Sequence, residues 1–403
     1  MGKVIVLLSL LIFIAEGCRK PYLPQVISKN SSYLVVEGVI NSGADSTYIK
    51  LSRTVQLSAS DTPKLVLGAT VNVESDGNGT YILNELGNGV YACAPLNLSY
   101  NSKYRLRIKT TDNREYLSDY IQAKKTPVID SISFKIQNNG LQFYVNTHDT
   151  QNGTIYYRWD FSETWKYVSY IQSFYKLDST GYPVFRVGYR TYDNIYECYK
   201  SLQSHQILLA SSAKLGKDVI SMYPINFVAA STGKLPFGYT FLLKQYALTP
   251  DAFNYWQSLK KNTEQLGSVF DAQPTSLPSN IHCVSNPSET VIGYLSVSSV
   301  TSLRKFVDHY YDYKDLYSPA YFPPPDAGAC PTPLIYINPS QSFVYRLHQA
   351  LGSGDSTLIK PMFVLGDNAP VIVAYYYAPA DCVDCRRKAP YGTTAIPVYW
   401  PYQ

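Results

Sequence analysis

Between residues 33 and 122 the chain alternates short apolar segments with turns rich in Gly and Asn, and this pattern limits the possible folds most strongly. Residues 47–53 (TYIKLSR) alternate apolar and polar side chains, as a half-buried strand requires. The turns at 77–79 and 87–89 contain glycines, which adopt positive φ at little cost. Strands separated by turns at about every eight to twelve residues are typical of a β-sandwich. The expected strands are 33–39, 47–53, 69–74, 80–84, 89–92, 103–109 and 116–122.

The length and the strand pattern together predict a mainly β fold with at least two domains. A chain of 403 residues exceeds one comfortable core. We expect an N-terminal immunoglobulin/fibronectin-like β-sandwich over residues 32–127. A larger β-rich domain with long insertions and a few helices should follow over residues 128–403. Its expected strands are 132–136, 141–146, 156–161, 207–209, 219–220, 239–247, 290–298 and 371–377.

One helix is predicted in the second domain, near residues 250–266. Thr249 is a good N-cap, Pro250 fits the first helical position, and Asp251 complements the helix dipole. A stripe of apolar residues recurs at helical spacing, namely Ala252, Phe253, Trp256 and Leu259. Such a stripe is far more often core than ligand site, so we expect it to be buried.

The N-terminus has the pattern of a bacterial lipoprotein signal. Lys3 precedes residues 4–14, an apolar run of eleven residues, which is shorter than the roughly 20 residues of a membrane-spanning helix. The small residue directly before Cys18 predicts cleavage there and lipid attachment to the Cys18 thiol. Residues 1–17 would then be the signal peptide and residues 18–31 a tether. An ordinary cleaved signal that leaves Cys18 as a thiol is the alternative, and the short run disfavours an uncleaved anchor.

Six further cysteines would fold in an oxidising compartment and could form disulfides. The sequence alone does not choose their pairing. For the single CxxC, Cys382 and Cys385, we predict disulfide stapling of the C-terminal segment over redox or metal chemistry, with Cys330 as the first partner to test. Cys93 stands alone and is expected to be a buried free thiol. The disulfide candidates are Cys198, Cys283, Cys330, Cys382 and Cys385.

Motifs for catalysis or cofactor binding are absent from the sequence. The five histidines occur singly without HExxH, and neither a P-loop nor GxGxxG is present. The net charge of +5 is spread along the chain, which disfavours a nucleic-acid partner. We therefore expect no enzyme activity, no cofactor and no metal. Asp149, Asp160 and Glu163 flank aromatic residues, which suits a sugar site and suits an exposed strand edge equally well.

Tyrosine is unusually abundant, with 38 residues in the chain. Its rings suit surfaces that bind through wide, stiff, amphipathic contacts, and they also suit the faces of β-sheets. Both a binding surface and a simply aromatic-rich β protein agree with this composition.

Three stretches resemble a family of Bacteroidota outer-membrane lipoproteins known as domain of unknown function 4249. The first is residues 33–41 (YLVVEGVIN), close behind Cys18. The second begins at 267–274 (GSVFDAQP) and continues through Asn280-Ile-His282 to Gly293-Tyr-Leu295. The third is Asp381-Cys-Val-Asp-Cys385, which is followed near the terminus by IPVYW at 396–400.

This resemblance implies an outer-membrane address and association with TonB-dependent receptors, and it carries no assigned catalytic or binding residues. We therefore expect a lipid-anchored outer-membrane accessory protein, a binding or partner subunit of a TonB-dependent transporter. Its ligand and its orientation, on the cell surface or on the periplasmic face, stay open. The alternatives are a structural or adhesive β-sandwich protein of the cell envelope and, less favoured, a glycan-active hydrolase.

Overall fold

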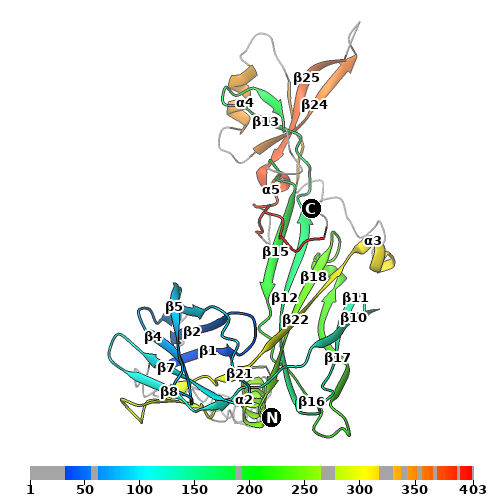
Figure 1. The fold of residues 1–403 in the computed structure, drawn as a ribbon. Helices are drawn as coiled ribbons and strands as arrows, with labels where there is room; N and C mark the ends of the chain where they lie inside the picture. Colours follow the sequence, from blue (N-terminus) through cyan, green and yellow to red (C-terminus); the bar gives the residue numbers. More distant parts are fainter. Residues whose placement is uncertain are drawn as a thin grey trace, which may run out of the picture.

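The computed structural model describes residues 32–55, 62–186, 193–264, 277–316, 330–336, 343–351, 356–365, 370–387 and 391–401. Strands arranged in five sheets dominate these residues, with a few short helices between them. The expected mainly β fold class is confirmed. Three parts follow one another in Figure 1, namely a sandwich at lower left, a central pair of sheets and an arm at the top. The predicted signal peptide, Cys18 and the tether lie outside the described residues.

The N-terminal part is an antiparallel β-sandwich, as its strand pattern predicts. Inward side chains from both halves meet in one core, for example Ile49 and Tyr91 with Leu106 and Tyr116, all fully buried. The strand order is β8-β7-β4-β5-β6-β2-β1. The strands are β1 (Leu34–Asn41), β2 (Thr47–Arg53), β3 (Lys64–Leu65), β4 (Thr70–Ser75), β5 (Thr80–Gly87), β6 (Val90–Cys93), β7 (Lys103–Lys109), β8 (Glu115–Ser118) and β9 (Ile121–Gln122).

A segment from much later in the sequence completes this sandwich. We call residues 277–298 the return segment. It contains β19 (Ile281–Cys283), which pairs with β8, and β20 (Val291–Ile292) and β21 (Ser296–Ser298), which both pair in parallel with β1. β1 and β8 would otherwise be open sheet edges with unpaired backbone groups. The sandwich expected over residues 32–127 therefore also includes this part of the second region.

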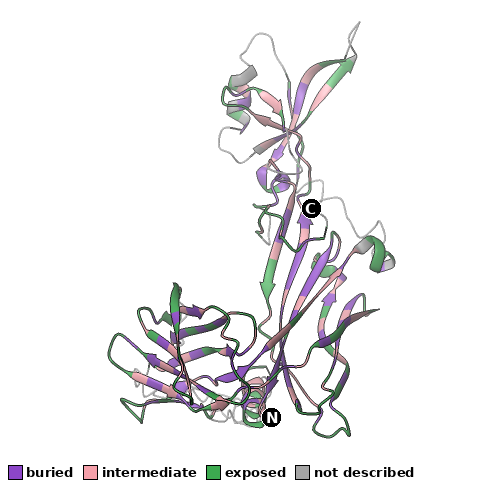
Figure 2. Cartoon of the chain, in the orientation of Figure 1, coloured by how far each residue is buried: buried purple, intermediate pink, exposed green. Residues whose placement is uncertain are grey.

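The central part consists of two packed sheets. One core cluster contains residues of both sheets, and Figure 2 shows many buried residues along their strands. Phe143 stacks on Phe241 at 5.4 Å between ring centroids, and Trp159 stacks on Tyr223 at 5.1 Å. The first sheet contains β10 (Ile129–Gln137), β11 (Gly140–His148) and β17 (Val219–Ala229). The second contains β12 (Tyr156–Val168), β15 (Glu197–Gln203), β16 (Leu208–Ser211), β18 (Tyr239–Leu248) and β22 (Val300–Val307), and η1 (Ala230–Thr232) follows β17.

The predicted helix is present as α2, Pro250–Glu264. The backbone N–H of Ala252 donates to Oγ1 of Thr249 at 3.2 Å, which is the expected N-cap. Of the predicted apolar stripe, Ala252 is buried, whereas Trp256 and Leu259 are only partly buried. The expectation that the stripe is core therefore holds for one end only.

The arm contains a third small sheet formed by β23 (Leu334–Tyr336), β25 (Pro370–Pro379) and β24 (Ser356–Leu365). β25 contains the predicted strand 371–377, but it pairs with β24 and β23 instead of joining the central sheets. β24 lies outside the strands that the sequence predicts. The arm also contains the short hairpin β13 (Tyr175–Leu177) and β14 (Pro183–Phe185), and α4 (Phe343–Leu351). The remaining helices are α3 (His309–Asp312), η2 (Lys314–Leu316) and α5 (Ala380–Val383).

Two disulfides fix the base of the arm. Cys330 bonds to Cys382 in α5, and Cys198 in β15 bonds to Cys385 just after α5. The CxxC cysteines therefore bond to two different partners and not to each other. Cys283 was a disulfide candidate, and here the structure corrects the expectation: it is a free thiol. It is buried in the N-terminal sandwich as part of β19, while the bonded cysteines gather around α5.

Within the described ranges, no helix has both the length and the apolar composition needed to cross a bilayer.

Candidate ligand cleft

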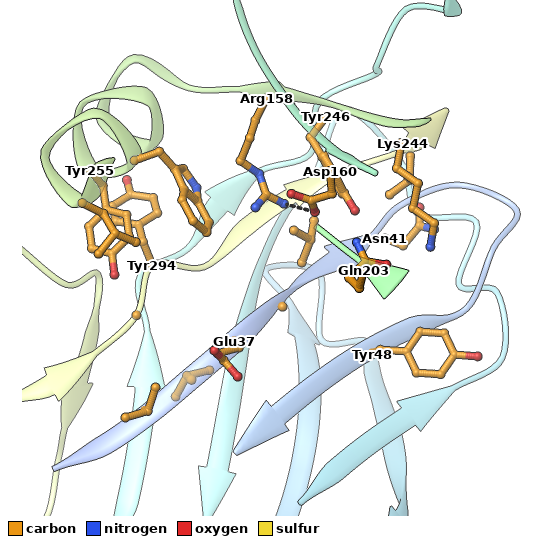
Figure 3. Close-up of a pocket in the computed structure, with 18 of the residues that line it drawn as sticks. Glu37, Asn41, Tyr48, Arg158, Asp160, Gln203, Lys244, Tyr246, Tyr255 and Tyr294 are labelled. Carbon is orange, nitrogen blue, oxygen red and sulfur yellow. Dashed lines mark hydrogen bonds and ion pairs between the residues drawn. The ribbon is translucent and has the colours of Figure 1, made fainter. Parts of the chain in front are cut away.

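An open cleft of about 900 Å³ lies between the N-terminal sandwich and the second central sheet. One wall is formed by β1, the turn after it and the return segment around Gly293. The other wall is formed by β12, β18, the end of β15 and α2 (Figure 3). A cleft of this size is within the range of pockets that hold small organic ligands, and domain interfaces are a common place for them.

Strand periodicity places two charged residues of β12 on the cleft wall. Tyr157, Trp159 and Phe161 face the core, so Arg158 and Asp160 point to the opposite side. The neighbouring strand β18 continues the pattern, because Tyr246 lies opposite Arg158 and Lys244 opposite Asp160. These four residues form the centre of the wall in Figure 3.

Arg158 is 8% exposed, and two aromatic rings hold its guanidinium group. Its Cζ lies 4.4 Å from the ring centroid of Tyr246 and 4.2 Å from that of Trp256. Nη2 donates to Oδ2 of Asp160 at 3.0 Å. Nε is buried and has no hydrogen-bond partner among the described residues. Arg158 is therefore fixed in position while part of its donor capacity stays unused.

Asp160 connects the cation and the tyrosine. Besides accepting the bond from Arg158, its carboxylate acts electrostatically on the Tyr246 hydroxyl. Burial raises the pKa of the Tyr246 hydroxyl, and the charge of Asp160 raises it further. The Tyr246 hydroxyl therefore stays protonated and neutral at physiological pH.

Helix α2 supplies the aromatic end of the cleft. Trp256 and Leu259 line it, and Tyr255 packs beside Tyr294 of the return segment with ring centroids 5.1 Å apart. Burial raises the pKa of both tyrosines. The half of the predicted stripe that is not core thus forms part of the cleft wall.

The opposite wall, from the sandwich, contributes acidic and aromatic groups. Glu37 and Asp45 are exposed there, and Tyr48 is 56% exposed. An oxygen of Glu37 lies 3.8 Å from Nζ of Lys50 on the neighbouring strand. The two walls therefore differ in charge, with cations concentrated on the β12–β18 side.

Of the three acidic residues singled out in the sequence, only Asp160 lies in the cleft. Asp149 accepts backbone N–H bonds from Gln151, Gly153 and Thr154 at 2.9–3.0 Å. Burial alone would raise the pKa of Asp149, but these donors outweigh it and lower the pKa. Asp149 thus stabilises a loop.

Glu163 is buried on the core side of β12. Lys234 donates to one of its oxygens, and Oη of Tyr239 donates to the other at 2.8 Å. Burial and this carboxylate raise the pKa of Tyr239 well above its usual range. Glu163 therefore belongs to a satisfied structural network. In the described part of the chain no group of three His, Cys, Asp or Glu side chains could hold a metal ion.

Sequence reasoning missed Arg158, Lys244 and the role of Trp256. A signal was present for the first, since Arg158 and Asp160 are charged residues two positions apart in the otherwise aromatic strand YYRWDF. Side chains two apart share a face. A strand with both faces covered by core would not place two charges on one of them.

The comparisons with known proteins agree with the resemblance seen in the sequence. The family model described as Domain of unknown function (DUF4249) matches residues 19–304. This range includes both walls of the cleft and the return segment. No curated protein matches the chain.

Proposed function

We propose that this chain, which belongs to the family Domain of unknown function (DUF4249), is a ligand-binding accessory protein of a bacterial outer membrane. In this proposal lipid on Cys18 anchors the chain, and the cleft holds a nutrient for a TonB-dependent transporter. The chain acts as a binding subunit, without chemistry of its own.

The observation that carries the proposal is the state of Arg158. Arg158 is 8% exposed and donates a hydrogen bond only to Asp160 among the described residues, a state that is expensive to maintain without a ligand. Two rings nevertheless hold it on the wall of a cleft that is large enough for a small organic molecule. Such pre-organised polar groups beside apolar surface are the usual composition of a binding site.

The anchoring part of the proposal is supported by the apolar run at residues 4–14 and the position of Cys18. Replacing Cys18 with Ser should move the protein from the membrane fraction to the soluble fraction, because lipid is the proposed anchor. Cys93→Ser is the matched control and should leave the protein in membranes. Retention of the Cys18→Ser variant in membranes would contradict lipid anchoring.

The cleft is tested by filling it. Gln203 at the end of β15 lines the cleft and is exposed, so Gln203→Trp should obstruct ligand and reduce nutrient uptake. Gln206→Trp, three residues away and outside the cleft, is the control and should leave uptake unchanged.

The partner is tested by affinity purification of the tagged full chain from detergent-solubilised membranes. Recovery without a TonB-dependent receptor, under several nutrients, would contradict the accessory role.

A structural or adhesive role is the second candidate, and the arm favours it. Phe363, Val364 and Val371 in the outer part of the β24–β25 hairpin are each about half exposed, between 49% and 55%. Apolar surface of this kind often marks a protein contact. Loss of cell attachment with normal nutrient uptake, after replacing these three residues with Ser, would favour adhesion over import.

A further inference from the structure

We propose that the ligand of the cleft carries a carboxylate group and that the guanidinium of Arg158 binds it. This inference rests on the proposed binding function and adds the chemistry of the ligand. The shared feature is one carboxylate beside a ring or apolar group, which occurs in uronic-acid saccharides and at the C-terminus of peptides.

The first argument is the donor balance of Arg158. A guanidinium has five N–H donors, and the carboxylate of Asp160 takes the bond from Nη2. Among described residues Arg158 donates a hydrogen bond to no other group. The protein encloses Nε, so the donors left for a ligand are the remaining terminal N–H groups on the cleft wall. A buried charged donor without an acceptor loses its hydration and gains nothing in return. An anionic acceptor from the ligand would complete this donor set.

The second argument is the rigidity of the Arg158 guanidinium. Tyr246 and Trp256 contact the guanidinium with centroid distances of 4.4 and 4.2 Å, so its plane is held before any ligand arrives. Asp160 fixes the rotation of the group within that plane through Nη2. Arginine held in this way recognises planar, bidentate anions such as carboxylates better than lysine does. Pre-organisation also reduces the entropy lost on binding.

The third argument is the sign of the charge on this wall. Lys244 lies opposite Asp160 in the strand register and is exposed, with no ion pair among the described residues. On this wall the two positive charges of Arg158 and Lys244 are opposed by one carboxylate, that of Asp160. The wall therefore has an excess of positive charge. Attraction at this wall favours a ligand group with negative charge.

The facing wall limits how much negative charge the ligand can carry. Glu37 and Asp45 are exposed on the sandwich side and would repel a polyanion such as a nucleic acid or polyphosphate. The same carboxylates accept hydrogen bonds from hydroxyl or amide groups. Tyr48 and Trp256 offer ring faces that remain partly accessible. The cleft therefore fits a molecule with one carboxylate, several hydrogen-bond donors and a ring or apolar face.

The test compares acids with their neutral derivatives on the mature-length chain carrying Cys18→Ser. One pair of probes is galacturonic acid and its methyl ester, and the other is a tripeptide and its C-terminal amide. Binding is measured by titration calorimetry and by tryptophan fluorescence. Trp256 is the natural reporter, because Trp159, Trp165 and Trp400 are buried. In at least one pair the acid should bind about tenfold tighter than its neutral derivative, or more.

Variants assign this preference to Arg158. Arg158→Lys keeps the charge but removes the planar fork, so the acid should bind about tenfold more weakly while the neutral probe changes little. Lys244 is exposed, so the Lys244→Gln variant should fold normally. It should bind the acid about threefold more weakly and bind the neutral probe unchanged. Arg105→Lys is the matched control, because Arg105 also covers a tyrosine ring, at 4.6 Å from Tyr120, but outside the cleft.

Each outcome decides the inference. The probe pair in which the acid binds more tightly than its neutral derivative identifies the source of the carboxylate, a saccharide or a peptide. Equal binding of acid and neutral derivative in both pairs would overturn the carboxylate inference while the binding function stands. Failure of every acid to bind would overturn it as well, and uptake by the Gln203→Trp strain would still report on the cleft independently. A preference for acid that persists in a folded Arg158→Lys variant would remove the role assigned to Arg158.

Discussion

Replacing Gly293 with alanine should separate the return segment from β1. Gly293 lies between β20 and β21 with φ of 132°, which L residues rarely adopt. An added Cβ would lie 2.2 Å from the carbonyl oxygen of Val36 and 3.1 Å from its carbonyl carbon. Because the obstacle is backbone, a change of rotamer cannot relieve it. The parallel pairing that closes this side of the sandwich must give way.

Two contributions set the expected destabilisation of the return segment by Gly293→Ala. Backbone strain of this kind costs about 1–3 kcal/mol, and each lost strand hydrogen bond adds about 1 kcal/mol. With about two bonds lost, Gly293→Ala should destabilise the return segment by roughly 3–5 kcal/mol. Gly87→Ala isolates the strain term, because Gly87 has φ of 89° but its added Cβ meets nothing within 4 Å. Gly216→Ala should be neutral, since it has open space and no positive φ.

Labelling of the Cys283 thiol reports how often the return segment opens. Cys283 is 2% exposed in β19 of the same return segment, and its thiol is not disulfide-bonded. In a chain carrying Cys18→Ser and Cys93→Ser it is the reactive thiol that remains. We expect native-state thiol labelling of Cys283 to be at least about tenfold faster in Gly293→Ala than in Gly87→Ala, because the rate tracks the population of the opened segment. Urea unfolding should show the same order of stability.

Equal labelling rates in the two glycine variants would refute this reasoning, because they would show that the close approach to Val36 does not hold the segment. Faster labelling with unchanged urea unfolding would instead locate the change in the return segment alone. Since this segment also lines the cleft, ligand affinity should fall together with labelling protection.

Three further predictions concern other parts of the chain. Replacing both Cys198 and Cys385 with Ser should destabilise the fold by about 2–5 kcal/mol, because their bond closes 187 residues; an unchanged denaturation midpoint would contradict this. Trp256→Ala should weaken acid binding about tenfold in calorimetry by removing one ring from the guanidinium, and unaltered affinity would exclude that contact. The hydrogen bond and charge of Asp130 raise the pKa of His148, so this pair stabilises the fold below about pH 6.5 and the contribution disappears as pH rises through the raised folded pKa. An NMR titration should therefore give a pKa above 6.5 for His148 and a lower value in Asp130→Asn; equal values would disprove the pairing.

The cleft depends on a connection that joins distant parts of the chain. The helix α2 and the return segment follow each other in sequence, and together they lead the chain from the central sheet back to the first sandwich. Lys124 also bridges to Ser298 at the boundary between the two parts. The two cleft walls are therefore linked by several crossings of the chain, which keeps Arg158 and Tyr48 on opposite sides of one cavity.

Local patterns in the sequence were sufficient to predict most strands. The seven segments predicted between 33 and 122 all correspond to observed strands, because alternation and glycine turns act over a few neighbouring residues. The helix predicted near 250–266 and observed at Pro250–Glu264 follows for the same reason, since its cap and dipole residues are adjacent in sequence. The mainly β class follows from these elements alone.

Long-range partners were decided only by the tertiary structure. Whether Trp256 is core or cleft depends on what faces it, and the groups that face it come from β12 and β18. Likewise Cys283 and Cys330 look alike in the sequence, but among the described residues only Cys330 of the two comes near another thiol, because the chain carries Cys283 into the N-terminal sandwich. Periodicity encodes which face of an element is buried; it does not encode which element covers that face, because that pairing depends on the packing of the whole chain.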